Sequence, residues 1–246
     1  MTGVGLGRCG TAWVLLMALV ADAYASLSVV GTRFVYPADA SALTIRVGNA
    51  GMRPALVQAW LDRGDDRLDP SAIRVPFILS PPLLRMDPQE TQALQLRHTG
   101  EPLPDDRESL FWLNLLEVPS REDDGGNLLL VSYRLRMKVL FRPRGLAGDP
   151  LEAARQVAWR LRAATRPGDR AVLEADNRSP YHVSLVHLEL GEGAGSLSLG
   201  SVTLPPFAMT PLVLPAIPVS AARVHFAVVG DNGQVERGAA AAKEYP

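Results

Sequence analysis

The stretch NLLLVSYRLRMKVLFRP, residues 127–143, alternates large apolar side chains with polar and cationic ones. One parity carries Leu129, Val131, Tyr133, Leu135 and Met137. The other carries Ser132, Arg134, Arg136 and Lys138. Because successive side chains of a β-strand project to opposite faces, the stretch predicts a strand with one apolar and one cationic face. The apolar face can enter the protein's own core or successive pockets of a partner, where each fully buried side chain contributes roughly 1.5–3 kcal/mol.

Short runs with the same period of two recur along the 246-residue chain and are separated by Pro, Gly, Asp and Asn. This pattern predicts an all-β fold built from antiparallel sandwiches, because 20 prolines and 21 glycines leave little room for long helices. The segment RPRGLAGDP, residues 142–150, separates two halves of domain size, residues 26–144 and 150–240. Residues 241–246 show no packing pattern, and we expect them to form a loose tail.

The first 25 residues resemble an export signal. Arg8 precedes an apolar stretch over residues 11–20, and Ala23-Tyr24-Ala25 forms a small-x-small cleavage site, so we expect cleavage after Ala25. Cys9, the one cysteine of the chain, would leave with the signal. The mature chain is then expected to have no disulfide, no catalytic thiol and no cysteine metal site.

Composition and motifs argue against several classes of function. A net charge of -1 and a pI near 6.4 give no general attraction to nucleic acid. The glycine-rich segments at residues 3–7 and 191–195 lie in the signal and between strand-like runs, so neither predicts a phosphate loop. The four histidines lack the converging pattern of a metal centre: His98, His182, His187 and His225. We therefore expect no catalytic residue, no bound metal and no cofactor.

Six segments, in this order and at this spacing, resemble the landmarks of one family, the periplasmic chaperones of chaperone-usher pili. The pair DRESLFWLNLLEVP and KVLFRP is the most specific combination among them, and the resemblance covers nearly the whole mature chain. The segments are TRFVYP (32–37), AWL (59–61), DRESLFWLNLLEVP (106–119), KVLFRP (138–143), NRSPYHVSL (177–185) and LPPFAMTPL (204–212).

The resemblance implies two immunoglobulin-like β-sandwich domains set as a boomerang, with a binding cleft between them and no catalysis. It also implies a periplasmic protein that binds pilus subunits. Such a subunit lacks its final strand, and the chaperone lends one of its own, a form of β-strand addition. The chaperone then passes the subunit to an outer-membrane usher. The short polar loop at residues 119–127 resembles the short-loop branch of the family.

Site residues follow from the same resemblance. Arg33 and Lys138 are expected to bind the C-terminal carboxylate of the subunit, a suitable task for an arginine fork and a lysine point charge. The donor strand is expected to insert Leu129, Val131 and Tyr133, while Leu135 and Met137 have a more internal role. A second charge cluster resembles the family's interdomain network: Glu108, Arg142 and Asp231.

Ideal alternation places Lys138 on the face opposite to the donor side chains. This arrangement requires either a bulge near Arg136 or a lysine that reaches around the edge of the strand. The sequence leaves both solutions open. It is also silent on whether the free protein covers its apolar strand by forming a self-capping homodimer.

Two other functions compete with that of an assembly chaperone. An exported two-domain sandwich can bind a carbohydrate or another surface ligand, and a β-sandwich hydrolase is the third candidate. No paired carboxylates or nucleophile motif support the hydrolase. The sequence therefore favours a periplasmic pilus-assembly chaperone that is not an enzyme.

Overall fold

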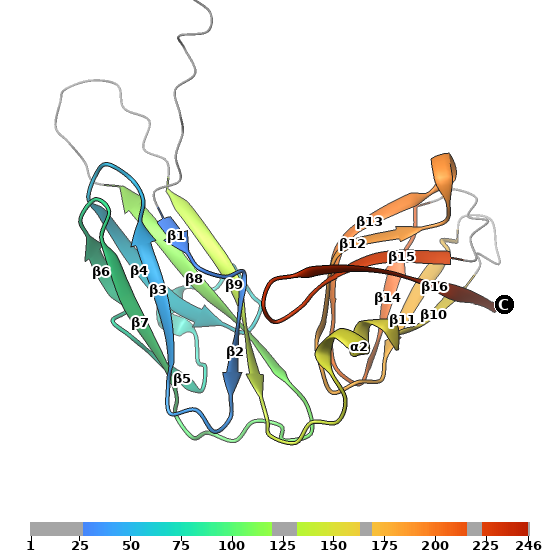
Figure 1. The fold of residues 1–246 in the computed structure, drawn as a ribbon, viewed down its shortest axis with the longest axis horizontal. Helices are drawn as coiled ribbons and strands as arrows, with labels where there is room; N and C mark the ends of the chain where they lie inside the picture. Colours follow the sequence, from blue (N-terminus) through green and yellow to red (C-terminus); the bar gives the residue numbers. More distant parts are fainter. Residues whose placement is uncertain (1–26, 120–131, 163–168, 216–222, 246) are drawn as a thin grey trace, which may run out of the picture.

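The computed structural model of the protein describes residues 27–119, 132–162, 169–215 and 223–245. It confirms the predicted all-β fold of two sandwich domains, set at an angle like the arms of a boomerang (Figure 1). The first domain has two sheets. The four-stranded sheet contains, in spatial order, β1 (Leu27–Val29), β3 (Leu43–Asn49), β7 (Thr91–His98) and β5 (Phe77–Ser80). The five-stranded sheet contains β2 (Arg33–Pro37), β9 (Tyr133–Arg142), β8 (Ser109–Pro119), β4 (Ala55–Asp62) and β6 (Leu83–Met86).

Period-two alternation places the core of the first domain between these sheets. In β4 every second side chain is buried, starting at Ala55, whereas Leu56 and Gln58 are exposed. An aromatic cluster closes one end of the core, where Phe77 packs edge-on against Phe111 with ring centroids 4.9 Å apart. The sequence pattern and the burial pattern therefore agree along these strands.

The register of β9 shows how one strand carries both Lys138 and the apolar side chains of opposite parity. β9 pairs with β8 without a shift from Ser109–Phe141 to Glu117–Tyr133, so the strand has no bulge near Arg136. Met137 faces the core of the first domain, whereas Lys138 leaves the opposite face. Of the two solutions left open by the sequence, the bulge is therefore excluded, because a regular strand accommodates both groups by directing them to opposite sides.

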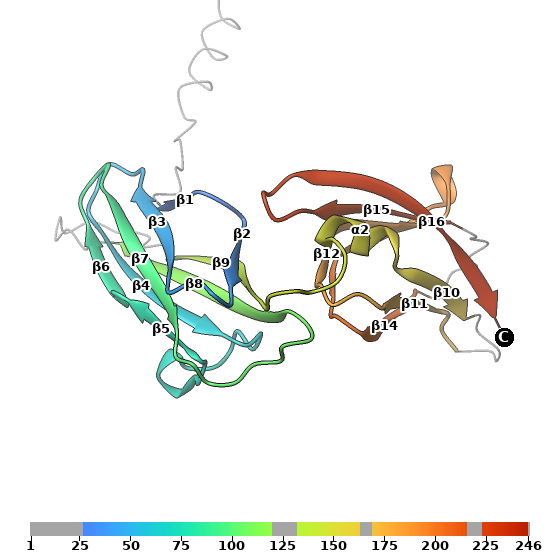
Figure 2. The same ribbon diagram turned by 60° about the horizontal axis from the view of Figure 1, so that its bottom comes forward.

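The second domain wraps one continuous sheet around its core. Its strands are, in spatial order, β13 (Leu197–Leu204), β12 (Val183–Leu190), β15 (Arg223–Val229), β16 (Val235–Tyr245), β10 (Ala158–Arg162), β11 (Val172–Asn177) and β14 (Ala208–Val213). The first part of β16 pairs antiparallel with β15, and its last part pairs parallel with β10 (Figure 2). β16 therefore connects the two layers of this sandwich.

The expected loose tail at residues 241–246 was wrong, because β16 continues to Tyr245. Ala242 pairs with Trp159 of β10 and is 6% exposed within the core cluster of the second domain. Consecutive alanines hide a period of two, since inward and outward positions have the same small side chain. Backbone pairing, rather than a hydrophobic pattern, orders this segment.

Within the described residues, the strands are joined by three short helical segments: α2 (Pro150–Arg155), η2 (Pro70–Ala72) and η3 (Gly193–Gly195). α2 follows the linker between the domains, and Asp149 caps it by accepting hydrogen bonds from the backbone N–H groups of Leu151 and Glu152 at 2.8 and 3.3 Å. Across the described ranges, no helix has the length and apolarity needed to span a membrane.

A matched pair of glycines tests the packing of β16. A Cβ added at Gly238 would lie 2.6 Å from the ring of Phe226, so Gly238→Ala should lower the unfolding free energy of the second domain by about 1–3 kcal/mol. Gly195→Ala meets no heavy atom within 4 Å and should change it by less than about 0.5 kcal/mol. Urea unfolding measures both values, and equal stabilities of the two variants would contradict the close packing of Phe226 on β16.

Candidate functional site

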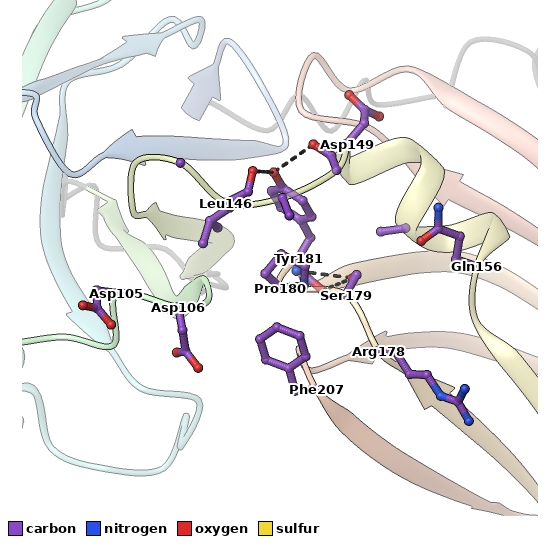
Figure 3. A pocket seen from close by; sticks show the side chains of 14 residues that line it. Asp105, Asp106, Leu146, Asp149, Gln156, Arg178, Ser179, Pro180, Tyr181 and Phe207 are labelled. Atoms are coloured by element: carbon purple, nitrogen blue, oxygen red, sulfur yellow. Dashed lines mark hydrogen bonds between the residues drawn. The ribbon is translucent and has the colours of Figure 1, made fainter.

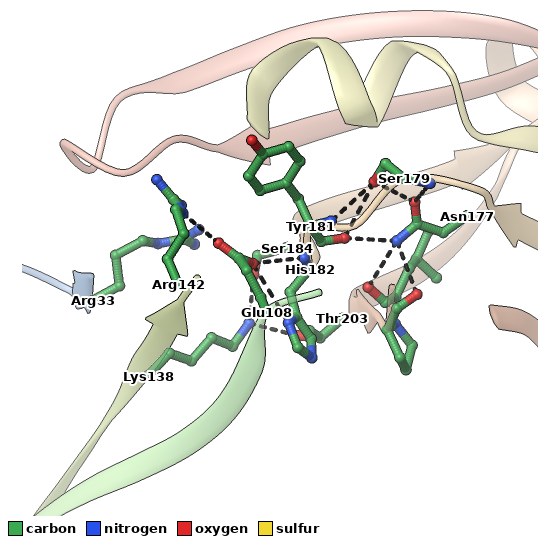
Figure 4. A network of polar contacts seen from close by, with 12 residues as sticks. Arg33, Glu108, Lys138, Arg142, Asn177, Ser179, Tyr181, His182, Ser184 and Thr203 are labelled. Carbon is green, nitrogen blue, oxygen red and sulfur yellow. Dashed lines mark hydrogen bonds and ion pairs between the residues drawn. The ribbon is translucent and has the colours of Figure 1, made fainter. Parts of the chain in front are cut away.

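Arg33 and Lys138 lie side by side on neighbouring strands. β2 pairs parallel with β9, and these two residues are directly opposite in the register. Both side chains reach the second domain (Figure 4). Arg33 Nη1 donates a hydrogen bond to the carbonyl oxygen of Val229 at 2.6 Å. Lys138 Nζ lies 2.9 Å from Ser184 Oγ and 2.5 Å from Thr203 Oγ1. The sequence-predicted pair is therefore assembled at the junction of the domains.

The electrostatic environment of this pair is unfavourable for two cations. Among the described residues, neither Arg33 nor Lys138 forms an ion pair with a carboxylate. Burial and then the nearby charge of Arg33 lower the pKa of Lys138 to about 8. Burial also lowers the pKa of Arg33, although the charges of Asp231 and Glu108 offset part of this effect. An anion placed between the two cations would gain charge-assisted hydrogen bonds from both.

A variant of Lys138 tests this electrostatic cost. The folded-state pKa, about 8, lies below the ordinary value of 10.5, so between these values the unfolded chain binds more protons and the unfolding free energy rises with pH. Lys138→Met should remove this rise and should raise the unfolding free energy at pH 7 by about 1–2 kcal/mol, a value reduced for solvent screening. Denaturant unfolding at pH 7 and pH 10 measures both effects, and a variant as pH-dependent as the native protein would contradict them.

A second cluster of charges joins the two domains directly. Glu108 is 2% exposed, and its Oε1 accepts a hydrogen bond from Arg142 Nε at 2.7 Å. Arg142 also binds Asp231 of the second domain through two bonds, of 2.6 and 2.9 Å. The other carboxylate oxygen of Glu108 accepts a bond from the backbone N–H of His182 at 2.8 Å. The structure thus brings Glu108, Arg142 and Asp231 together around one guanidinium.

The charge state of Arg142 follows from these contacts. Burial disfavours its charged form, but the hydrogen bonds to Asp231 and the charge and bonding of Glu108 raise the pKa of Arg142 above its ordinary value. The guanidinium also lies 5.3 Å from the ring centroid of Tyr181. A permanently charged arginine is therefore held between one carboxylate of each domain, which favours a defined interdomain orientation.

The linker between the domains is also held in place. The hydroxyl of Tyr181 lies 3.3 and 3.2 Å from the carbonyl oxygens of Leu146 and Gly148, to which it donates. A pocket of about 430 Å³ lies beside this contact and is lined by both domains (Figure 3). Figure 3 shows Asp105 and Asp106 of the first domain opposite Phe207 of the second. Tyr181, whose ring lies under the guanidinium of Arg142, therefore also fastens the linker.

Replacing Arg142 tests the role of this junction. Arg142→Gln leaves the buried carboxylate of Glu108 without its cation and should lower the unfolding free energy by about 2–3 kcal/mol, because Arg142 itself is partly exposed. It should also broaden the distances between spin labels on one engineered cysteine in each domain. Arg144→Gln is the control, since Arg144 pairs with the exposed Asp39 outside the second domain. A distance distribution as narrow as that of the control would show that Arg142 does not fix the orientation.

Of the predicted donor residues, Tyr133 and Leu135 belong to β9. Leu129 and Val131 lie outside the described residues. Tyr133 is 53% exposed, Leu135 is half-buried against the core of the first domain, and Met137 is 8% exposed within it. The more internal position expected for Leu135 and Met137 agrees with this burial. Among the described side chains of this parity, the exposed Tyr133 is therefore the one that a partner can reach.

Several polar partners at the junction had no signal in the sequence. The hydroxyls of Ser184 and Thr203 and the carbonyl of Val229 come from three different strands of the second domain. Nothing in the local pattern identifies a hydroxyl that meets a lysine 46 positions away in the chain. A further cluster around Asp62 on the first domain was also missed, although the tryptophans Trp60 and Trp112 mark its place in the sequence.

Both domains match family descriptions. "Pili and flagellar-assembly chaperone, PapD N-terminal domain" matches residues 26–147, and "Pili assembly chaperone PapD, C-terminal domain" matches residues 152–240. Two curated relatives support the same assignment. The chaperone protein FimB/FhaD of Bordetella pertussis is 40% identical over 85% of this chain and 83% of its own length. The probable fimbrial chaperone YadV of Escherichia coli is 34% identical over 90% of this chain and 92% of its own length.

Solved structures give the same result. The crystal structure of the YadV chaperone aligns with a TM-score of 0.74 and 33% identity, covering 88% of this chain and 100% of that one. The structure of the Salmonella enterica SafA pilin in complex with the SafB chaperone aligns with a TM-score of 0.72 and 27% identity, covering 88% and 96%. The similarity therefore extends across both domains.

Proposed function

Because the chain belongs to the PapD family of pilus assembly chaperones, which are not enzymes, we propose that it binds pilus subunits through strand donation and a carboxylate anchor. In this proposal the start of β9 fills the groove of a subunit that lacks its final strand. Arg33 and Lys138 bind the C-terminal carboxylate of that subunit. The complex then delivers the subunit to an outer-membrane usher.

The observation that carries the proposal is the buried pair of cations. Arg33 and Lys138 lie opposite each other without an anionic partner among the described residues, so a carboxylate would relieve the repulsion between them. The hydroxyls of Ser184 and Thr203 lie within bonding distance of Lys138 and can rotate to donate to the same carboxylate. Arginine and lysine together suit a chain terminus better than a neutral sugar.

The pairing of β9 supports strand donation. β9 pairs with β2 over Lys138–Arg142, whereas it pairs with β8 from Tyr133 onward. Residues 133–137 therefore have one edge that is not paired with any described strand, and Figure 1 shows that β9 begins well before the level at which β2 starts. Such an edge offers backbone donors and acceptors to a partner that lacks a strand. The chaperone–pilin complex among the structural neighbours favours a pilus subunit as this partner.

The family works in the periplasm, and the proposal places this protein there. Residues 1–25 act as the export signal, with cleavage after Ala25. N-terminal sequencing of the protein purified from a periplasmic extract tests this step. A protein that begins at Met1 would contradict it.

Co-expression with a candidate pilus subunit tests the anchor. Arg33→Ala plus Lys138→Ala should reduce the recovered soluble subunit at least about tenfold, because two charge-assisted contacts are lost. Arg85→Ala plus Lys243→Ala removes the same charge from exposed positions and is the matched control. Equal recovery with both double variants would refute the anchor, while glycan binding without any effect on the subunit would favour the carbohydrate-binding alternative.

A charge placed on the donor parity tests strand donation separately. Val131→Glu should abolish complex formation, because a carboxylate would enter an apolar groove. Ser132→Glu adds the same charge on the opposite parity and should leave the complex intact. Size-exclusion chromatography of the co-purified proteins measures both. Undiminished binding of Val131→Glu would show that this parity does not enter the subunit.

A further inference from the structure

The outward face of the five-stranded sheet carries a ladder of cations and tryptophans beside the free edge of β9. The guanidinium of Arg134 lies 4.9 Å from the ring centroid of Trp60, and that of Arg136 lies 4.4 Å from Trp112. Lys138 Nζ lies 5.5 Å from the same Trp112 ring. Each of these three cations therefore covers an aromatic ring of β4 or β8, a favourable contact for both. We call these four residues, Arg134, Arg136, Trp60 and Trp112, together with Asp62 and Asn114, the cation–tryptophan ladder.

Asp62 holds the ladder together. It is 0% exposed, and its Oδ1 accepts hydrogen bonds from Arg136 Nη2 at 2.7 Å and from the backbone N–H of Gly64 at 2.6 Å. Its Oδ2 accepts a hydrogen bond from Asn114 Nδ2 at 2.7 Å. A buried carboxylate is costly unless such partners surround it. Such a group is weak evidence for added stability, but its several bonds fix the relative positions of β4, β8 and β9.

Arg134 extends the same network to the next turn of chain. Its Nε and Nη2 donate to Asn114 Oδ1 at 3.0 and 2.6 Å, and its Nη1 donates to the backbone carbonyl of Asp66 at 2.9 Å. Arg134 is thus held by three hydrogen bonds, and Arg136 by its hydrogen bond to Asp62 and its contact with Trp112, although both side chains are partly exposed. Because ordering a long side chain costs conformational entropy, these contacts must offset that cost.

The arginines of the ladder lie in the part of β9 that is paired on one side only. Residues 133–137 pair with β8 alone, because β2 contacts β9 only from Lys138 onward. A strand with one neighbour frays more readily than one paired on both sides. Arg134 and Arg136 lie within this single-sided segment, and their contacts reach across β8 to β4. The ladder therefore connects the free segment to two further strands.

We infer that the cation–tryptophan ladder positions the donor segment, holding residues 133–137 extended and in register before a subunit arrives. This inference rests on the proposed strand donation. Binding to a partner groove is faster and tighter when the donated strand is ordered in advance. On the face opposite the ladder, the exposed side chain of Tyr133 is then held ready for a partner. Arg134, Arg136 and Asp62 act as positioning residues and do not touch the subunit.

Amide hydrogen exchange of the free, full-length mature protein tests the inference without any partner. Arg134→Gln plus Arg136→Gln should accelerate exchange of the β9 amides in residues 133–137 by at least about tenfold, because local opening becomes easier. Exchange in the second domain and in β4 should stay within about twofold. Asp62→Asn should have the same local effect and provides a second route if the double variant folds poorly. Arg85→Gln, on the same sheet face but bound to exposed Asp87, is the control.

Two exchange results would overturn the inference: unchanged exchange in residues 133–137, or acceleration spread evenly through the first domain. A second experiment measures the rate at which the protein associates with a pilus subunit that lacks its final strand. The ladder variants should associate about three- to tenfold more slowly than the Arg85→Gln control. Local acceleration with an unchanged association rate would also overturn the positioning role. Failure of the native protein to bind any subunit would instead refute the proposed function, which separates the two failures.

Discussion

The unshifted pairing of β9 with β8 is the constraint from which the functional arrangement of the first domain follows. Because this register is regular from Tyr133 to Phe141, side chains alternate strictly between the core and the outer face. Met137, Val139 and Phe141 enter the core, while Arg134, Arg136 and Lys138 leave the other face. β9 thus contributes side chains to the core, two arginines to the ladder and Lys138 to the proposed anchor. A one-residue slip would exchange all of these roles at once.

The second domain supplies the polar partners of Lys138 and Arg33. Lys138 reaches hydroxyls of β12 and β13, and Arg33 reaches a backbone carbonyl at the end of β15. The orientation of the domains therefore decides whether the two cations stay together. Arg142 lies only four residues beyond Lys138 on the same strand and bridges Glu108 and Asp231. Lys138 of the proposed anchor and Arg142 of the interdomain charge cluster consequently lie on one strand, so a change in the domain angle alters the surroundings of Lys138.

Much of this arrangement could be predicted from the sequence. Period-two runs and turn residues were sufficient for the sandwich architecture, and family landmarks identified Arg33, Lys138 and the Glu108 cluster. The final strand was missed because alanine at both parities gives no alternation, even though Ala242 is buried. Ser184, Thr203 and Asp62 were missed for a different reason. Their roles depend on contacts between residues far apart in the chain, and a hydroxyl or carboxylate carries no local mark of its distant partner.

The free protein has two groups of unpaired contacts, a cation pair and a strand edge, and a single ligand can bind both. The cation pair lacks an anion among the described residues, and the start of β9 lacks a neighbour on one edge. Tyr133 and Lys138 are five positions apart on one regular strand, a separation of about 17 Å at the usual rise per residue. A chain that ends at the anchor and runs along this edge therefore has its register fixed by its own terminus. Because a slip of one residue in this pairing would turn the apolar side chains of the donor strand away from the subunit's groove, the proposed carboxylate anchor would determine which donor side chains enter it.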